Sequence, residues 1–246
     1  MLSVIALVFA MTLGSPSVFA TSDGLSNTQK KDVETFVRDY LRKNPEILVD
    51  AIRALRDKEL ANTERSAKDS LKLLRTQIEN SPYSPVGGNP NGDVTLVEFF
   101  DYRCPYCKKV FPDIMALLKQ DKGIRYVFKE FPILGPVSVI ASRAALAAWS
   151  IDKDKYVAFH KTMMGSRGQL TEERIFKMAK KNGIDPDQLR KAMKDPGVSA
   201  EINRNASMAN ALNITGTPAF VIGNAIVPGA VDMKTLKILV SEARGR

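Results

Sequence analysis

The chain has few of the side chains that most enzymes use for chemistry. Its 246 residues include two cysteines, one histidine and one tryptophan. Beyond residue 20, no apolar run approaches the roughly 20 residues that a membrane-spanning helix needs. Internal repeats and low-complexity segments are also absent. We therefore expect the mature chain to be soluble and its chemistry to centre on the two cysteines.

The net charge of +9 comes from 36 Lys and Arg against 27 Asp and Glu. A basic surface of this kind can attract nucleic acid or an anionic membrane. However, basic residues alternate with acidic ones almost everywhere, and no basic block is interleaved with aromatic residues. The pattern favours a solvated basic surface and no nucleic-acid partner.

The first 20 residues carry no ionisable side chain. Leu2 to Leu13 form an apolar core, and Ser17 to Ala20 place small residues where a signal peptidase cleaves. This pattern predicts a secretory signal peptide over residues 1–20, a mature chain from about Thr21 and a periplasmic location. The usual Lys or Arg before the core is missing, and a buried N-terminal helix is the alternative. Export matters because a disulfide persists in an oxidising compartment.

The next segment has the periodicity of two helices that precede the main domain. Residues 28–43 place five apolar side chains on one helical face: Val33, Phe36, Val37, Tyr40 and Leu41. Asn44 and Pro45 suit the N-cap and first position of a second helix, which runs to about Asn80. The Ser-, Pro- and Gly-rich residues 81–90 are typical of a linker. We place the domain boundary there, with a helical arm over 21–82 and the main domain over 83–246.

The second predicted helix is long, and its last apolar positions form a narrow seam: Ala67, Leu71, Leu74 and Ile78. Spacings of four and three residues are typical of coiled coils. Because so narrow a seam cannot form a core alone, we expect this helix to pack against another copy of the chain. The hypothesis is a homo-oligomer through residues 28–80. The alternative is a helix that folds back onto its own domain.

The main domain has alternating strand and helix patterns. We expect strands over 95–101 and 124–131, a helix from the cysteines to about 120, helical pieces over 136–212, a hairpin of 218–222 and 225–227, and a closing helix over 232–244. Breaks in the helical pieces are expected at Gly165-Ser166, Gly183 and Pro196. This order is that of an α/β thioredoxin fold with a helical insertion.

Both cysteines lie in one motif, Cys104-Pro105-Tyr106-Cys107, directly after the first strand. Two thiols separated by two residues at a strand-to-helix junction are typical of a thiol–disulfide oxidoreductase. Helix N-termini stabilise a thiolate, so Cys104 is the expected nucleophile and Cys107 the resolving thiol. One alternative is a zinc site with His160, but it lacks a fourth ligand. The other is a structural disulfide, although so short a loop gains little stability from one.

Three segments resemble the DsbA family of thiol–disulfide oxidoreductases. Residues 97–107, Val-Glu-Phe-Phe-Asp-Tyr-Arg-Cys-Pro-Tyr-Cys, are similar to its active-site segment. Residues 216–220, Gly-Thr-Pro-Ala-Phe, are similar to its cis-proline loop, and residues 126–132 fit its next strand. The resemblance covers the chain from about Asp93 to the C-terminus.

The resemblance implies roles for further residues. Pro218 would be a cis-proline against the cysteines, with a trans turn proline as the alternative. The Thr217 backbone would bind an extended substrate, and Pro105 and Tyr106 would line the same site. Threonine before this proline resembles the isomerases DsbC and DsbG.

The resemblance also implies a proton-transfer group. Glu98 would accept protons from the thiols, unless strand alternation places it at the sheet surface, and Lys129 would be its charge partner. Tyr106 stands where the best-known DsbA has a histidine, which implies a less oxidising disulfide. His160 is expected to have a packing or capping role. No cofactor or resident metal is expected.

The preferred hypothesis is a periplasmic protein disulfide isomerase or reductase whose arm resembles that of stalk-bearing ScsC members of the family. Its partners would be unfolded or wrongly disulfide-bonded secreted proteins and a membrane or periplasmic redox partner. Three alternatives stay open. They are a DsbA-type oxidase, a Cu(I)-handling thiol protein, since thiolates favour soft Cu(I), and a holdase without redox activity.

Overall fold

The computed structural model describes residues 24–245, so the predicted signal peptide lies outside the described residues. The chain divides into two compact units, residues 1–57 and 58–246. The first unit contains helix α1 (Asn27–Lys43), which begins with a capping box between Ser26 and Gln29 and buries none of its residues. Helix α2 (Glu46–Asn80) follows and crosses the boundary between the units. Across the described residues, no helix is both long and apolar enough to cross a membrane.

The second unit contains a five-stranded sheet in the order β1-β3-β2-β4-β5. Its strands are β1 (Val86–Gly88), β2 (Val94–Phe100), β3 (Ile124–Glu130), β4 (Ala219–Ile222) and β5 (Ala225–Pro228). The β2–β3 pair is parallel and every other pair is antiparallel. The predicted thioredoxin fold is therefore confirmed. Strand β1 was not expected, because its Val-Gly-Gly sequence lies in the stretch that resembles a linker.

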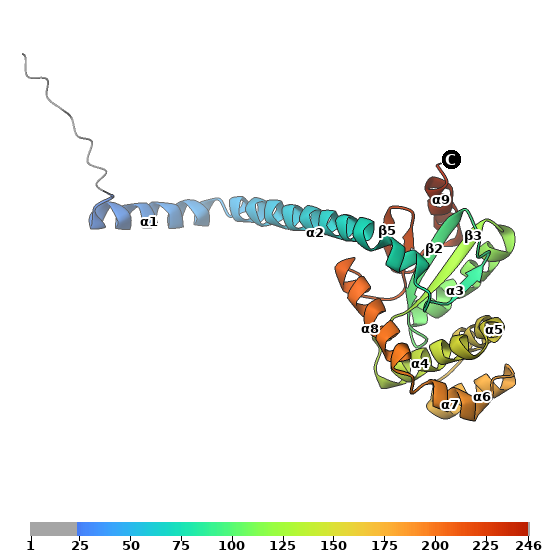
Figure 1. Ribbon diagram of the computed structural model, residues 1–246. Helices are drawn as coiled ribbons and strands as arrows, with labels where there is room; N and C mark the ends of the chain where they lie inside the picture. Colours follow the sequence, from blue (N-terminus) through green and yellow to red (C-terminus); the bar gives the residue numbers. More distant parts are fainter. Residues whose placement is uncertain (1–23, 246) are drawn as a thin grey trace, which may run out of the picture. The chain divides into compact units, whose positions relative to one another are not determined.

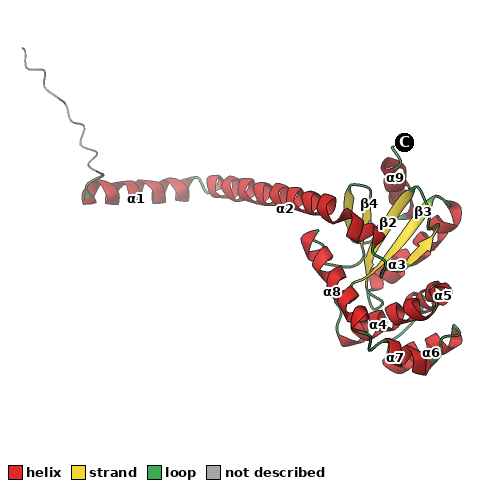
Figure 2. Ribbon diagram, in the orientation of Figure 1, coloured by secondary structure: helices red, strands yellow, loops and turns green. Residues whose placement is uncertain are grey.

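Helices cover both faces of the sheet (Figure 2). Helices α3 (Pro105–Gln120) and α9 (Met233–Ala243) contribute to the core on one face. Helix α8 (Pro196–Ala211) and the C-terminal half of α2 contribute to the core on the other face. The helical insertion is confirmed as several pieces; its first four helices form a block beside the sheet (Figure 1): α4 (Pro136–Ile151), α5 (Lys153–Met164), α6 (Glu172–Lys181) and α7 (Pro186–Ala192).

The seam of α2 packs on this sheet, which corrects the sequence prediction. Ala67, Leu71 and Ile78 are 6%, 1% and 0% exposed within the single chain. Leu71 and Ile78 belong to a core cluster with residues of β2, β3, β4 and α8. The prediction that this seam packs against a second copy is wrong, and the alternative of packing on its own domain is right for residues 67–78. A narrow apolar stripe is also what one helix needs to lie on one face of a sheet. The compact unit consequently begins at Lys58 rather than near residue 83.

Candidate active site

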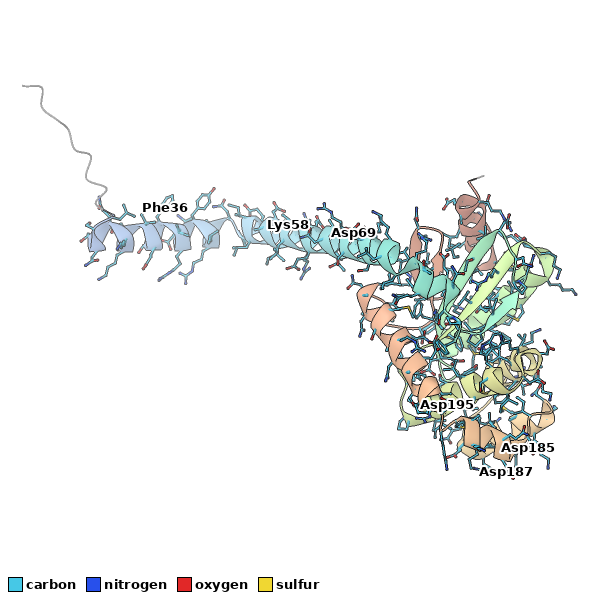
Figure 3. The ribbon with its side chains drawn as sticks, in the orientation of Figure 1. Phe36, Lys58, Asp69, Asp185, Asp187 and Asp195 are labelled. Atoms are coloured by element: carbon cyan, nitrogen blue, oxygen red, sulfur yellow. The ribbon has the colours of Figure 1, made fainter. Side chains whose placement is uncertain are left out.

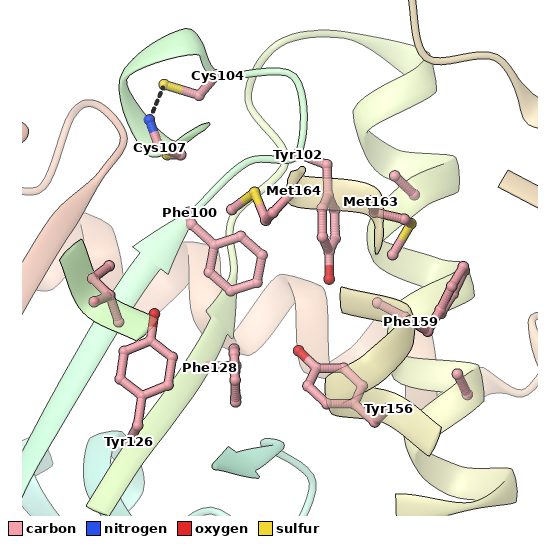
Figure 4. Close-up of a cluster of buried hydrophobic side chains, with 14 of the residues drawn as sticks. Phe100, Tyr102, Cys104, Cys107, Tyr126, Phe128, Tyr156, Phe159, Met163 and Met164 are labelled. Carbon is pink, nitrogen blue, oxygen red and sulfur yellow. Dashed lines mark hydrogen bonds between the residues drawn. The ribbon is translucent and has the colours of Figure 1, made fainter. Parts of the chain in front are cut away.

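The two cysteines lie at the start of α3, as the sequence predicts. Cys104 is the N-cap residue, Pro105 occupies the first turn, and both cysteines are free thiols. The Sγ atom of Cys104 accepts a hydrogen bond from the backbone N–H of Cys107 at 3.5 Å (Figure 4). Such N–H groups at a helix start have no partner within the helix, so they favour a negative sulfur. Cys104 is 4% exposed and Cys107 is fully buried.

The loop before β4 lies against the nucleophile. The Cys104 thiol donates a hydrogen bond to the carbonyl oxygen of Thr217 at 3.1 Å. The Thr217–Pro218 bond is cis, so the expectation of a cis-proline is confirmed and the trans alternative is wrong. Thr217 is half-buried and Pro218 is buried. This contact joins two segments that are more than 100 residues apart in the sequence.

Glu98 is buried on the face of the sheet that carries the cysteines. The Tyr126 hydroxyl donates a hydrogen bond to its Oε2 atom, and its Oε1 atom has no partner. Burial raises the pKa of Glu98 to about 8. Burial first, and then the Glu98 charge, raises the pKa of the Cys107 thiol far above its ordinary value. The alternative that Glu98 lies at the sheet surface is wrong. A carboxyl group that titrates near neutral pH beside a buried thiol suits proton transfer.

Lys129 is not the charge partner of Glu98, contrary to expectation. In the parallel β2–β3 register, Glu98 aligns with Phe128, and Lys129 aligns with Phe99. Because side chains alternate along a strand, Lys129 extends from the opposite face. Its ammonium donates to the Gln77 carbonyl at 3.1 Å and to Ser84 Oγ at 2.7 Å. Burial lowers its pKa to about 8. Lys129 therefore ties β3 to α2 and to the segment before β1.

His160 has the packing role that the sequence predicts. It is buried among the rings of Phe100, Phe128 and Tyr156, and its Nδ1 atom lies 2.9 Å from the Tyr102 hydroxyl. Burial lowers its pKa to about 3. Among the described residues, no three His, Cys, Asp or Glu side chains are grouped so that they could hold a metal ion.

Sequence reasoning missed two buried carboxyl groups near the site. Asp101 precedes the motif, and Glu130 ends β3 and accepts hydrogen bonds from Tyr102 and Ser142. Burial raises the pKa of Glu130 well above its ordinary value. The available signal was an acidic residue at the end of each buried strand. Alone it does not distinguish a buried carboxyl group from one in the solvated loop that follows.

Exposed apolar side chains occur in the cysteine motif and in residues 133–139, and we call them the apolar rim. Tyr106, Ile133, Leu134 and Val139 are 62%, 41%, 40% and 36% exposed. Pro105 is exposed beside Cys104. The Arg103 guanidinium donates a hydrogen bond to the Leu134 carbonyl and so links the cysteine turn to this rim.

With this geometry established, comparisons with known proteins assign the family. Residues 95–240 match the DSBA-like thioredoxin domain family. Residues 29–61 match the family described as the copper resistance protein ScsC N-terminal domain. The curated sodium–proton antiporters of two Salinispora species match 64% of this chain over 24% of their own length, so the chain spans about a quarter of those proteins.

Solved structures agree. A thioredoxin-like oxidoreductase from Silicibacter pomeroyi is 43% identical, with a TM-score of 0.67 over 70% of this chain and 98% of that one. ScsC from Proteus mirabilis in a transitional conformation is 33% identical, with a TM-score of 0.67 over 90% of this chain and 99% of that one. The thiol–disulfide exchange protein α-DsbA2 from Wolbachia pipientis is 34% identical, with a TM-score of 0.68 over 73% and 96%. The chain belongs to the DsbA-like thioredoxin family, and its second unit is a thiol–disulfide oxidoreductase domain.

Proposed function

We propose that this DsbA-family chain is a periplasmic protein disulfide isomerase or reductase. The observation that carries the proposal is the Cys104 thiol at the start of α3, hydrogen-bonded to the Thr217 carbonyl beside cis-Pro218. A thiol placed there can attack a disulfide in an extended segment that binds along the Thr217 backbone. The exposed Pro105 and Tyr106 extend this surface with apolar contacts for unfolded secreted proteins.

In isomerisation, the Cys104 thiolate attacks one sulfur of a wrong client disulfide. That S–S bond breaks, a mixed disulfide forms, and the client keeps one thiolate. Another client thiolate then attacks the client sulfur of the mixed disulfide, which forms a new client disulfide and returns the Cys104 thiolate. The electrons balance without an external oxidant.

In reduction, Cys107 resolves the mixed disulfide instead. Its thiol transfers its proton to Glu98, and the sulfur attacks Cys104 while the client sulfur leaves. The client is reduced by two electrons and the Cys104–Cys107 disulfide forms. A periplasmic or membrane redox partner with a dithiol must then reduce that disulfide. Run in the opposite direction, the same step is the oxidase alternative.

The N-terminal segment supports isomerase over oxidase. Helix α1 exposes its apolar face, with Val33 at 47%, Phe36 at 68%, Val37 at 46% and Tyr40 at 48% exposure (Figure 3). Residues 29–43 of this helix lie in the region that matches the ScsC N-terminal domain. An exposed stripe of this size fits self-association. Several active sites on one assembly would hold a misfolded client through repeated encounters.

The test compares reactivation of scrambled ribonuclease with oxidation of reduced ribonuclease. Deleting the whole arm is unsuitable, because Leu71 and Ile78 belong to a hydrophobic core of the unit that carries the cysteines. Phe36→Asp in the full chain places a charge on the apolar face of α1, and Thr35→Asp adds the same charge on its polar face. We expect Phe36→Asp alone to lower both the mass in sedimentation and the unscrambling rate. Fast oxidation without unscrambling in the wild type would establish the oxidase instead.

Cu(I) handling is the second candidate, favoured by the match to a family described through copper resistance. Cys104 and Cys107 would supply two soft thiolate ligands. Competition for Cu(I) with a colorimetric chelator tests it. Cys104→Ser should abolish Cu(I) retention, and retention unchanged by that substitution would exclude this site.

A further inference from the structure

Asp101 begins the turn that carries the nucleophile. The Cys104 N–H donates to the Asp101 carbonyl at 3.0 Å, and the Arg103 N–H donates to Asp101 Oδ1 at 2.8 Å. Aspartate is common at the first position of such turns, where serine or asparagine also serves. The turn alone therefore does not require an acidic residue here.

The Asp101 carboxyl group also accepts hydrogen bonds from the segment 134–138. Its Oδ1 atom accepts from Ser138 Oγ at 2.8 Å, and its Oδ2 atom accepts from the Leu134 N–H at 3.0 Å. Asp101 is completely buried. Both oxygens act only as acceptors, which is the hydrogen-bonding role of an ionised carboxylate. Asp101 thus joins the cysteine turn to the apolar rim and to the first turn of α4.

The other two buried carboxyl groups near the site, Glu130 and Glu98, both have raised pKa values. Burial raises the pKa of Glu130 well above its ordinary value, and the charge of Asp101 is a lesser cause of this rise. Burial raises the pKa of Glu98 to about 8, so Glu98 is mostly protonated at neutral pH. Arg103 is the nearby cation, but its side chain is exposed and water screens it.

We propose that Asp101 is a positioning residue whose negative charge also disfavours the Cys104 thiolate, so that the active-site disulfide is less oxidising than the same fold would otherwise make it. The start of α3 favours a negative sulfur, and a buried carboxylate one turn earlier opposes it. A less stable thiolate makes the reduced form less stable, and the disulfide then forms more readily. This inference rests on the proposed exchange chemistry but not on the choice between isomerase and oxidase.

The experiment measures the equilibrium between the reduced chain plus oxidised glutathione and the disulfide chain plus two reduced glutathione molecules. Asp101→Asn and Asp101→Ser both remove the charge and keep an acceptor for the Arg103 N–H. We expect each to shift the equilibrium toward the reduced chain by about tenfold, or about 30 mV. The thiolate absorbance at neutral pH should rise in both variants.

Two control variants separate the effect of the Asp101 charge from the effect of its hydrogen bonds. Ser138→Ala removes a hydrogen bond but keeps the carboxylate, so it should not increase the thiolate absorbance. Asp187→Asn makes the same charge change on the exposed surface of α7 and should have no effect (Figure 3). The proposal is overturned if the folded Asp101 variants leave the equilibrium unchanged or shift it toward the disulfide. Failure of the isomerase proposal appears separately, as a wild type that equilibrates with glutathione but does not unscramble ribonuclease.

Discussion

The Cys104 thiol and the Thr217 carbonyl oxygen lie 3.1 Å apart, and this hydrogen bond joins the start of α3 to the loop before β4. It satisfies the thiol in the resting dithiol state. When Cys104 ionises, the carbonyl loses its donor and becomes available to a backbone N–H from outside. The same atom can therefore hold the resting thiol and then bind an incoming extended segment.

The two cysteines should differ sharply in function. Cys107 is fully buried and burial raises its thiol pKa, whereas Cys104 keeps 4% of its surface exposed at the start of α3. We expect Cys107→Ser to accumulate a mixed disulfide with scrambled ribonuclease through Cys104, and Cys104→Ser to form none. Non-reducing electrophoresis followed by peptide mass spectrometry identifies the linkage. A mixed disulfide through Cys107 in the Cys104→Ser variant would reverse the assigned roles.

Glu98→Gln should change how stability depends on pH. The folded pKa of Glu98 is raised to about 8 from an ordinary 4.5. The folded chain therefore binds the extra proton, and stability falls as pH rises between these values. From pH 6.5 to 8 the free energy of unfolding of the wild type should fall by about 1.5 kcal/mol more than that of Glu98→Gln.

Urea unfolding at both pH values measures this difference. His160 and Lys129, whose pKa values are lowered to about 3 and about 8, make stability rise with pH mainly below 6.5 and above 8. Their contributions are the same in the wild type and in Glu98→Gln, so the difference between the two reports Glu98. Parallel pH profiles for the wild type and Glu98→Gln would show that Glu98 is ionised in the fold.

Lys129→Met tests whether this buried cation takes part in thiol exchange. Its ammonium bonds to Gln77 and Ser84 on the face of the sheet opposite Glu98. Sites without shared partners act independently, so the rate of mixed-disulfide resolution should change by no more than about twofold. Stopped-flow fluorescence with a disulfide peptide measures the rate. A large slowing in a variant that unfolds at the wild-type urea concentration would restore Lys129 to the proton-transfer machinery.

The sequence predicted the parts of the site that local chemistry determines. The cysteine motif, the helix that follows and the strand that carries Glu98 all depend on neighbours within a few residues. The partner of Lys129 could not be read this way, because the β2–β3 register decides which face a side chain occupies. Asp101 was missed for a related reason. Its significance comes from Leu134 and Ser138, which are more than 30 residues away.

The packing partner of the α2 seam also could not be predicted from local sequence. A matched pair of substitutions tests whether the seam packs on its own sheet. Leu71 is 1% exposed in the core on the sheet, whereas Leu73, two residues later, is 84% exposed. Leu71→Ala should lower the free energy of unfolding by about 3 kcal/mol, since it leaves a cavity. Leu73→Ala should change it by less than about 0.5 kcal/mol.

Urea unfolding of the full chain at two protein concentrations distinguishes the two arrangements. If α2 packs on its own sheet, the loss in Leu71→Ala is independent of concentration, because the contact lies within one chain. A seam between copies would instead make the loss disappear on dilution, since dissociated chains would already lack the contact. That result would return residues 67–78 to the oligomer interface.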